Sequence, residues 1–285
     1  MTPFGAESLG IPLTGLPVLR ELIHERTGMF FDRERTELLA ERMAPLVIER
    51  GFRSFLDLYY LLRYDEAAAP GAWRQVLDAL SVPETYFWRE MDQIRAIVCR
   101  AVPELARRGV GVLRIWSAPC ATGEEPLTIA MALEEAGWFD RLPIEIHGSD
   151  GSGAAIAKAR TGRYRQRAMR ALPPAMFEKY FTADGGTFVP RPALTQRITS
   201  WSVVNLMAPE EVAPYARSPI VFCRNAFIYF SPQAITRVVE QFGASMPTPG
   251  YLCVGASESL LNVTSTFALE EIERAFVYVK RSGNE

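Results

Sequence analysis

Histidine is scarce in this sequence, and its cysteines are not paired. Only His24 and His147 occur, and neither lies at a catalytic or metal-ligand spacing from a partner residue. The four cysteines are widely separated and form no CxxC pair, which argues against a zinc ribbon and against a disulfide framework. We therefore expect no metal site, and a reaction that does not need a strong histidine base.

Long apolar runs and an excess of one charge are also lacking. No apolar run approaches the ~20 residues that span a bilayer, and no basic region followed by an apolar run marks a signal peptide. Lysine and arginine total 31 against 33 aspartate and glutamate residues, which gives a net charge of −2. Neither the net charge nor the length of the apolar runs therefore indicates a nucleic-acid partner or membrane insertion. We expect a cytoplasmic protein.

The first 80 residues have helical periodicity and contain no catalytic motif. An apolar stripe runs through residues 19–23, between Pro17 and Gly28, which open and close a helix. A second helix continues the pattern, and Pro45 is expected to kink or divide it. The sequence thus predicts a helical amino-terminal domain over residues 1–80.

Apolar, strand-like runs alternate with helical segments in the rest of the chain. The runs lie at residues 112–118, 144–150, 219–225, 251–257 and 276–281. This alternation predicts an α/β fold with a doubly wound, Rossmann-like, mostly parallel sheet over residues 92–285, after a linker at 81–91. Glycines, prolines and short β-prone runs at about residues 181–202 predict a small antiparallel β-subdomain inserted into it.

The segment after the first strand has the composition of a ligand-binding turn. It reads SAPCATGEE from Ser117 to Glu125, and its small residues let a ligand approach the backbone closely. It is not GxGxxG, and Glu124 and Glu125 stand where a dinucleotide site places pyrophosphate. Carboxylates there favour a cationic, amino-acid-bearing ligand over NAD, although acidic residues also favour a helix start by themselves.

Polar residues follow two further strands. Asp150 ends the second strand, where a carboxylate can accept hydrogen bonds from vicinal ribose hydroxyls or cap the next helix. Asn205 and Leu206 follow the predicted β-subdomain. An amide at that position can read an adenine edge, and an apolar side chain can cover the face of the ring.

Two more groups of residues are candidates for the site. Arg224, Asn225 and Tyr229 follow the apolar run PIVFC, and polar groups at the end of a buried strand are typical of functional sites. Thr85 and Arg89 lie in ETYFWRE, where aromatic residues flank an arginine. Taken alone, that segment is explained more simply as a packed linker with a snorkelling arginine.

Together these segments resemble the CheR family, the chemotaxis receptor glutamate methyltransferases. The resemblance extends from the helical region to nearly the last residue. Its most specific parts are ETYFWRE, WSAPCATGEEPLTIAMAL, GSD followed by AKARTGRY, the FEKYF run, NL at Asn205, and FCRNAFIYF. It implies a helical domain, a linker that contributes to the cofactor site, and a methyltransferase domain that carries a β-subdomain.

The resemblance also implies a reaction and a set of site residues. The methyl group of S-adenosylmethionine would pass to glutamate carboxylates of methyl-accepting chemotaxis receptors, leaving S-adenosylhomocysteine. Arg89 and Tyr229 would border the reacting centre. The implied cofactor residues are Thr85, Arg89, Glu124, Asp150, Asn205, Leu206, Arg224 and Asn225. A glutamate is already ionised at neutral pH and needs no general base, which agrees with the scarcity of histidine.

Two regions are candidates for contact with the receptor. The second helical stretch is basic in the family and implicated in docking, but here its arginines at positions 33–53 are interleaved with glutamates, as on a solvated face with local ion pairs. In some relatives the β-subdomain holds a carboxyl-terminal peptide of the receptor by strand addition. The sequence leaves both contacts open.

Two other functions stand as alternatives. Departures from the usual family residues, such as Pro83 and Ala256, motivate a catalytically weak or silent S-adenosylmethionine-binding adaptor that acts through protein contacts. The retention of Arg89, Asp150 and Tyr229 favours the enzyme. An NAD-dependent oxidoreductase is disfavoured because the glycine fingerprint is missing from the turn.

Overall fold

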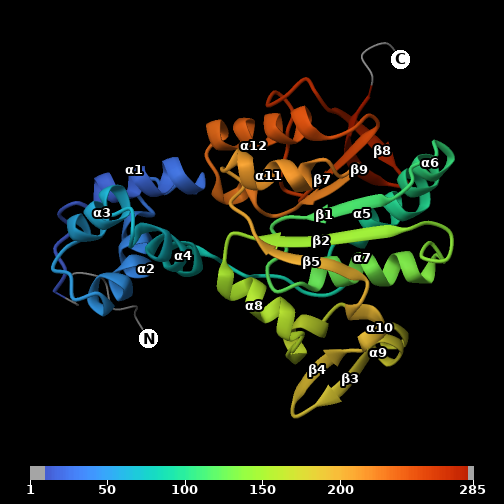
Figure 1. The fold of residues 1–285 in the computed structure, drawn as a ribbon, viewed down its shortest axis with the longest axis horizontal. Coiled ribbons are helices and arrows are strands. Elements are labelled where there is room, and N and C mark those ends of the chain that lie inside the picture. Colours follow the sequence, from blue (N-terminus) through green and yellow to red (C-terminus); the bar gives the residue numbers. More distant parts are fainter. Residues whose placement is uncertain (1–9, 282–285) are drawn as a thin grey trace.

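The computed structural model describes residues 10–281 and shows a helical domain beside an α/β domain (Figure 1). The outer ends of the two predicted domains, residues 1–9 and 282–285, lie outside the described part of the chain. The predicted fold class is confirmed: an all-α region precedes a Rossmann-like sheet that carries a small antiparallel subdomain.

The helical domain packs around its own apolar core. Its helices are α1 (Leu16–Thr27), α2 (Thr36–Glu49), α3 (Phe55–Tyr64) and α4 (Ala69–Leu80). Leu19 and Ile23 lie one turn apart on α1 and are fully buried in this core. The predicted division at Pro45 is wrong, because α2 runs through this residue. Pro45 is exposed, so water can hydrate the carbonyl that loses its helical partner there.

The α/β domain is built on a mainly parallel sheet. Its strands are β1 (Leu113–Ser117), β2 (Ile144–Asp150), β5 (Ile198–Val203), β6 (Ile220–Cys223), β7 (Gly250–Val254), β8 (Ala268–Ile272) and β9 (Ala275–Lys280). Their order is β5-β2-β1-β6-β7-β9-β8, and among these described strands β9 alone runs in the direction opposite to the rest. The chain changes direction across the sheet between β1 and β6, which places a crevice beyond their carboxyl ends.

Helices cover both faces of this sheet. They include α5 (Met91–Ala96), the π-helical turn η2 (Ile97–Ala101), α6 (Val102–Arg107), α7 (Glu124–Glu135), α8 (Gly153–Thr161), α11 (Pro209–Ala216) and α12 (Pro232–Ser245). Successive residues of β1 enter opposite cores, Ile115 with Ile129 of α7 and Trp116 with Phe242 of α12. The alternation of the strand thus separates two apolar layers.

A small subdomain follows α8 in the chain. It comprises η3 (Gln166–Met169), α9 (Pro174–Tyr180), β3 (Phe181–Asp184), β4 (Thr187–Pro190) and α10 (Pro192–Thr195). Strands β3 and β4 pair antiparallel in a sheet of their own. This antiparallel part is shorter than the predicted insert at residues 181–202, because β5 lies parallel to β2 at the edge of the main sheet.

Polar contacts join the helical domain to the carboxyl edge of the main sheet. The Asp78 carboxylate on α4 accepts hydrogen bonds from the Ser152 hydroxyl (2.6 Å) and the Ala154 N–H (2.9 Å), next to the start of α8. The Phe30 N–H donates to the Tyr229 carbonyl (2.8 Å). These contacts bring the helical domain against the strand ends that carry the predicted site residues.

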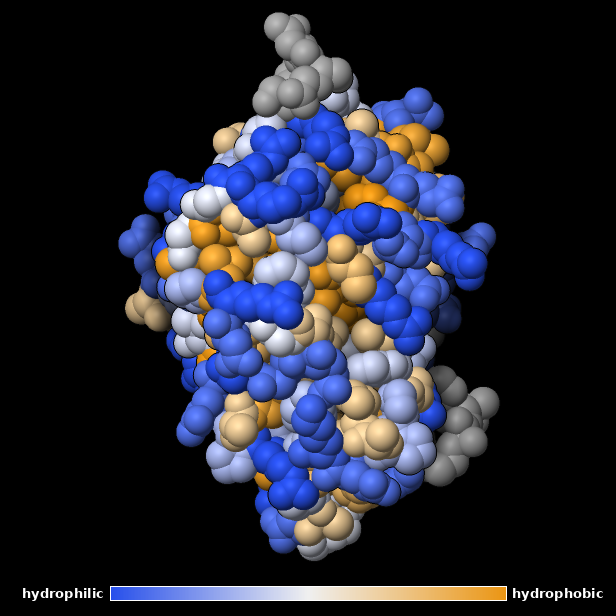
Figure 2. All heavy atoms as spheres, turned by 90° about the vertical axis from the view of Figure 1, so that its right-hand side faces the viewer, coloured by the Kyte–Doolittle hydropathy of each residue, from blue (hydrophilic) through white to orange (hydrophobic). Residues whose placement is uncertain are grey.

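The side of the molecule farthest from the helical domain is mostly hydrophilic, with small apolar areas between the polar side chains (Figure 2). Such a mixture is ordinary for the surface of a folded domain. Within residues 10–281, no helix combines the length and the apolar character needed to cross a membrane.

Candidate functional site

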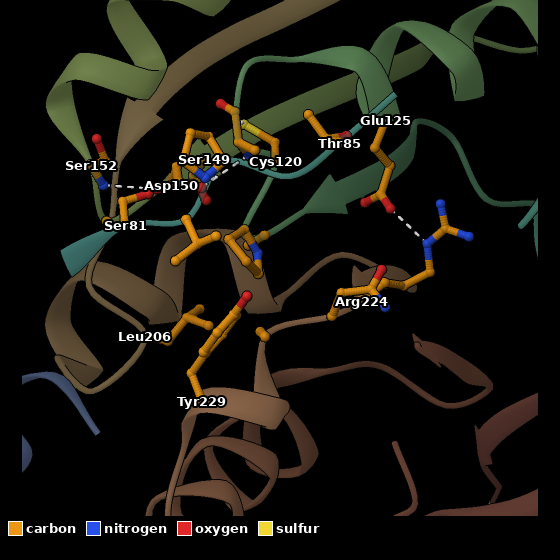
Figure 3. A pocket seen from close by; sticks show the side chains of 18 of the residues that line it. Ser81, Thr85, Cys120, Glu125, Ser149, Asp150, Ser152, Leu206, Arg224 and Tyr229 are labelled. Carbon is orange, nitrogen blue, oxygen red and sulfur yellow. Dashed lines mark hydrogen bonds and ion pairs between the residues drawn. The ribbon is translucent and has the colours of Figure 1, made fainter. Parts of the chain in front are cut away.

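A cleft lies at the carboxyl ends of β1, β2 and β6, between the sheet and the helical domain (Figure 3). Its volume is about 1110 Å³ including the open mouth, which is enough for a ligand of nucleoside size. The helical domain contributes Thr27, Met29 and Leu77, and the linker contributes residues 81–86. All the predicted site residues line this cleft except Glu124.

The turn after β1 brings the backbone up to the cleft. Residues 118–121, which are alanines, a proline and a cysteine, line it directly. Gly123 lies behind the turn with φ 96°, and a Cβ there would lie 2.9 Å from the Trp201 ring and 3.0 Å from the Ala159 Cβ. Glycine is therefore required both for the backbone conformation and for the close packing at the start of α7.

The two glutamates at the start of α7 have different surroundings. Glu124 is buried outside the cleft lining and accepts a hydrogen bond from the Thr122 hydroxyl (2.7 Å), and burial raises its pKa. Glu125 lines the cleft, accepts a hydrogen bond from the Ser117 hydroxyl (2.6 Å) and pairs with Arg224 Nε at 2.6 Å. Neighbouring side chains of a helix point about 100° apart, so Glu125 faces the cleft and Glu124 faces away from it. The prediction that Glu124 contacts the ligand is therefore not supported.

Asp150 ends β2 with its carboxylate held by the backbone. Oδ1 accepts the Ser152 N–H (2.8 Å) and Oδ2 accepts the Ala121 N–H (2.9 Å), as the dashed lines in Figure 3 indicate. Burial raises the pKa of Asp150, while these two donors act in the opposite direction. Each carboxylate oxygen has a further lone pair, so both can accept hydrogen bonds from vicinal hydroxyls of a ligand.

Asn205 lines the cleft, but its amide is engaged within the protein. Nδ2 donates to the Arg26 carbonyl (2.8 Å) at the end of α1, and Oδ1 accepts the Met207 N–H (3.0 Å). The side chain thus joins the helical domain to the loop after β5 rather than pointing both polar atoms at a ligand. Leu206 is buried, and its side chain and that of Tyr229 enter the cleft from the same side (Figure 3).

Arg224 follows β6 and joins three segments that surround the cleft. Its guanidinium pairs with Glu125 and donates from Nη1 to the Glu90 carbonyl (3.1 Å) and from Nη2 to the Arg89 carbonyl (3.2 Å). Burial by itself lowers the pKa of Arg224, but the charge and the hydrogen bond of Glu125, together with the charge of Glu90, act in the opposite direction, and the pKa is raised. Arg224 therefore holds the linker against the start of α7.

The linker places Thr85 and Arg89 in the cleft lining. The Arg89 Nη1 donates to the Glu84 carbonyl (2.8 Å), and Nε lies 3.7 Å from the Glu90 carboxylate. The Nη2 group of Arg89 makes no hydrogen bond within the described range 10–281. The guanidinium thus keeps donors for a ligand that enters the cleft.

The loop after β6 is held by Glu258, a residue that the sequence reasoning missed. Its half-buried carboxylate accepts hydrogen bonds from the backbone N–H groups of Asn225 (2.8 Å), Phe227 (2.6 Å), Ile228 (3.2 Å) and Gly255 (2.6 Å). Asn225 has a left-handed backbone (φ 58°). Glu258 therefore fixes the loop that carries Asn225 and Tyr229. In the sequence it ends the run GASE at residues 255–258, next to Ala256.

The cleft combines negative charge with apolar walls. Burial, followed by the charges of Asp150 and Glu125, raises the pKa of the Cys120 thiol, which lies in the cleft lining. Leu206 and Val82 supply apolar surface. A diol acceptor, carboxylates at two strand ends and an apolar wall fit S-adenosylmethionine, which carries a ribose, a sulfonium cation and an adenine ring.

The sequence matches two domains of one protein family over residues 15–81 and 83–276. The SAM binding domain of the CheR methyltransferase family matches residues 83–276, and the all-alpha domain of that family matches residues 15–81. Chemotaxis protein methyltransferase 2 of Vibrio cholerae is 31% identical over 267 residues, covering 92% of this chain and 91% of that protein. Chemotaxis protein methyltransferase 1 of Pseudomonas aeruginosa is 28% identical, covering 92% of this chain and 96% of that protein. The magnesium protoporphyrin IX methyltransferase of Synechocystis, solved with bound SAM, has a TM-score of 0.33 and 14% identity, covering 79% of this chain and 97% of that chain.

Proposed function

Because the chain belongs to the CheR methyltransferase family and is an S-adenosylmethionine-dependent methyltransferase, we propose that it methylates glutamate side chains of methyl-accepting chemotaxis receptors. The acceptor would be the cytoplasmic domain of the receptor, and the products would be glutamate methyl esters and S-adenosylhomocysteine. The observation that carries this proposal is the presence, in one cleft, of the buried Asp150 carboxylate and the Arg89 guanidinium. A cofactor ribose and an acceptor carboxylate require these two kinds of group.

The cofactor is held by the strand ends in this proposal. Asp150 binds the ribose hydroxyls, Leu206 covers one face of the adenine ring, and residues 118–121 let the ligand approach the backbone. Thr85, Asn205, Arg224 and Asn225 also line the cleft. Glu125, instead of Glu124, supplies the carboxylate at the start of α7, and its ion pair with Arg224 keeps it in place.

The acceptor carboxylate is oriented by Arg89, whose Nη2 donors point to no described partner. The cofactor supplies a sulfonium-bound methyl group, which passes to a carboxylate oxygen as the carbon–sulfur bond breaks and the sulfur keeps the electron pair. Tyr229 enters the same cleft and positions either reactant through its hydroxyl. Alignment and exclusion of water supply the rate enhancement, since an acceptor with a pKa of about 4.3 is ionised at neutral pH.

The β-subdomain offers a place for a carboxyl-terminal peptide of the receptor. One edge of β4 is occupied, because Phe188 exchanges backbone hydrogen bonds with Tyr164 (2.8 and 2.9 Å). The outer edge of β3 pairs with no other strand within the described residues. An extended peptide that adds to β3 would complete its hydrogen bonds and tether the receptor near the cleft.

Transfer of a labelled methyl group tests this function. The protein is incubated with tritium-labelled S-adenosylmethionine and receptor cytoplasmic fragments, with and without their last residues, and base-labile volatile label is counted. We expect label on the fragment, and less of it when the tail is removed. Binding of S-adenosylhomocysteine without any label on receptor would instead identify a silent adaptor, and binding of NAD would contradict both.

Two variants test the roles of the acceptor residues. Arg89→Ala should leave S-adenosylhomocysteine affinity within about threefold and lower the transfer rate by about 100-fold, because an oriented charge-assisted contact is lost. Tyr229→Phe removes only a hydroxyl and should have the smaller effect. Normal methylation by Arg89→Ala would remove the proposed role of that guanidinium.

A further inference from the structure

We propose that a basic ridge beside the cleft guides an acidic segment of the protein substrate to the reacting centre. The ridge consists of four exposed arginines in eight residues: Arg163, Arg165, Arg167 and Arg170. The inference rests on the proposed function, because the partner of matching charge is an acidic stretch of the chain that carries the acceptor glutamate. It assigns a docking surface in addition to the cleft and to the edge of β3.

The ridge belongs to a stretch without acidic residues. Residues 151–177 contain six lysines and arginines and no aspartate or glutamate, in a chain whose net charge is −2. Tyr164 and Ala168 lie between the ridge arginines and are buried, so the backbone is anchored while the guanidinium groups face outward. The local excess of positive charge is therefore presented on a fixed surface.

The ridge begins at the mouth of the cleft and ends at the subdomain. Arg167 and Arg170 pair with Glu84, a residue of the cleft lining, at 2.7 and 3.0 Å. At the other end Arg163 pairs with Asp184 of β3 at 2.6 Å. The ridge therefore lies between the mouth of the cleft and β3, where a polypeptide that leaves the cleft in the direction of β3 would pass along its side chains.

The ridge keeps a positive charge after its ion pairs are counted. Four guanidinium groups face two carboxylates, those of Glu84 and Asp184, which leaves 4 − 2 = +2. Arg165 has no ion-pair partner in the described part of the chain, and neither has the exposed Lys158 at the end of α8. Such exposed charges act mainly on the association rate and on its dependence on salt.

Helix α2 is less suited to the same role. Its Arg42 donates to the carbonyls of Ala79 and Leu80 (3.2 and 3.0 Å), and Arg50 donates to the Gln75 side chain. These arginines hold α4 in place. Glutamates also alternate with the arginines of this stretch, so its positive and negative charges nearly cancel. The charges of the ridge do not cancel.

Charge reversal at Arg165 of the ridge and at the nearby Lys158, which have no ion-pair partner among residues 10–281, tests the proposed role of the ridge. The double variant Lys158→Glu/Arg165→Glu should raise the KM for a receptor cytoplasmic fragment about 10-fold at low salt and only about twofold at about 0.5 M NaCl, because salt screens exposed charges. The kcat and the affinity for S-adenosylhomocysteine should stay within about twofold, since neither residue lines the cleft. The matched control is Arg217→Glu/Arg237→Glu, which reverses two exposed charges at the end of α11 and on α12, away from the ridge (Figure 1).

Each outcome of this experiment is decisive. An unchanged KM in Lys158→Glu/Arg165→Glu at low salt, or an equal rise in the control Arg217→Glu/Arg237→Glu, overturns the proposal. A variant that simply misfolds is recognised by its loss of S-adenosylhomocysteine binding, and Lys158→Gln/Arg165→Gln then replaces it, with an expected rise of about threefold. Failure of the proposed function gives a different result, because the wild-type protein itself would then transfer no base-labile methyl group to the fragment. That result would contradict both the proposed function and the proposed role of the ridge.

Discussion

At the scale of single residues, the site depends on carboxylates that are buried and yet keep acceptor capacity. Asp150 is only 7% exposed, and each of its oxygens accepts one backbone N–H. The donors stabilise the charge without using all the lone pairs. A ligand diol can therefore add its hydrogen bonds to a carboxylate whose orientation is already fixed, which limits the entropy lost on binding.

The affinity for S-adenosylhomocysteine should be independent of pH near neutrality and should decrease at acidic pH. Burial raises the pKa of Asp150 above the ordinary aspartate value of 3.8, so the carboxylate takes up a proton at a higher pH than an exposed aspartate does. The protonated group loses acceptor capacity, and binding weakens below the folded-state pKa. Calorimetric titration at several pH values measures this. In Asp150→Asn the affinity should be about 10-fold lower and this pH dependence lost; a wild-type profile in that variant contradicts the assignment.

The loop after β6 should depend on the carboxylate of Glu258. In Glu258→Gln one acceptor oxygen is replaced by an NH₂ group that faces backbone donors, so two of the four hydrogen bonds are lost. We expect a loss of about 2–4 kcal/mol in unfolding free energy and weaker S-adenosylhomocysteine binding, measured by denaturant unfolding with and without the ligand. Glu258→Asp keeps the charge and is expected to lose less. Equal stability of Glu258→Gln and wild type would show that the loop is held by other contacts.

The sequence predicted residue types at strand ends better than it predicted side-chain directions. Asp150 and Arg89 line the cleft as expected, because the ends of parallel strands and the linker converge there. Glu124 does not, since one residue along a helix changes the direction by about 100°. The Asn205 amide is used by the Arg26 carbonyl, a contact between domains that no local pattern contains.

At the scale of elements, edge strands were the hardest to recognise. The segment ITSWSV of β5 mixes polar and apolar residues because most of its residues are partly exposed at the sheet edge, so in sequence it resembles a surface hairpin. Strand β8, with the sequence ALEEI, was not predicted for the same reason. Central strands such as β6 are buried throughout and were recognised as continuous apolar runs.

The contact between α4 and the start of α8 should restrain the linker and protect it from proteolysis. Asp78 accepts the Ser152 hydroxyl and the Ala154 N–H through the same oxygen, Oδ1. Asp78→Ala removes both hydrogen bonds, at about 1–3 kcal/mol, so chymotrypsin should cleave the aromatic linker at residues 86–88 faster. The control Asp78→Asn keeps an Oδ1 acceptor and should be cleaved at nearly the wild-type rate. Equal cleavage of all three proteins would show that this contact does not restrain the linker.

At the scale of the whole molecule, the site belongs to both domains. Thr27, Met29 and Leu77 of the helical domain line the same cleft as the strand ends. The Asn205 amide and the Tyr229 carbonyl each bind the backbone of the helical domain, at Arg26 and Phe30. A ligand in the cleft therefore contacts both sides of the domain boundary, and its binding energy is coupled to domain association.

S-adenosylhomocysteine should therefore slow amide hydrogen exchange in the helical domain as well as in the α/β domain. The affected helical segments are residues 27–29 and the turn of α4 around Leu77, beside residues 118–121 and 204–206 of the sheet domain. At a ligand concentration about 100 times Kd, binding stabilises the closed form by about 2.7 kcal/mol, so slowing is limited to about 100-fold. At the same ligand concentration, which is about 10 times the Kd expected for Asp150→Asn, slowing in this variant should be limited to about 10-fold in both domains, although the substitution weakens a ligand contact on the sheet side alone. Slower exchange only in residues after 91 would show that the ligand does not stabilise the helical domain, although this domain lines the cleft.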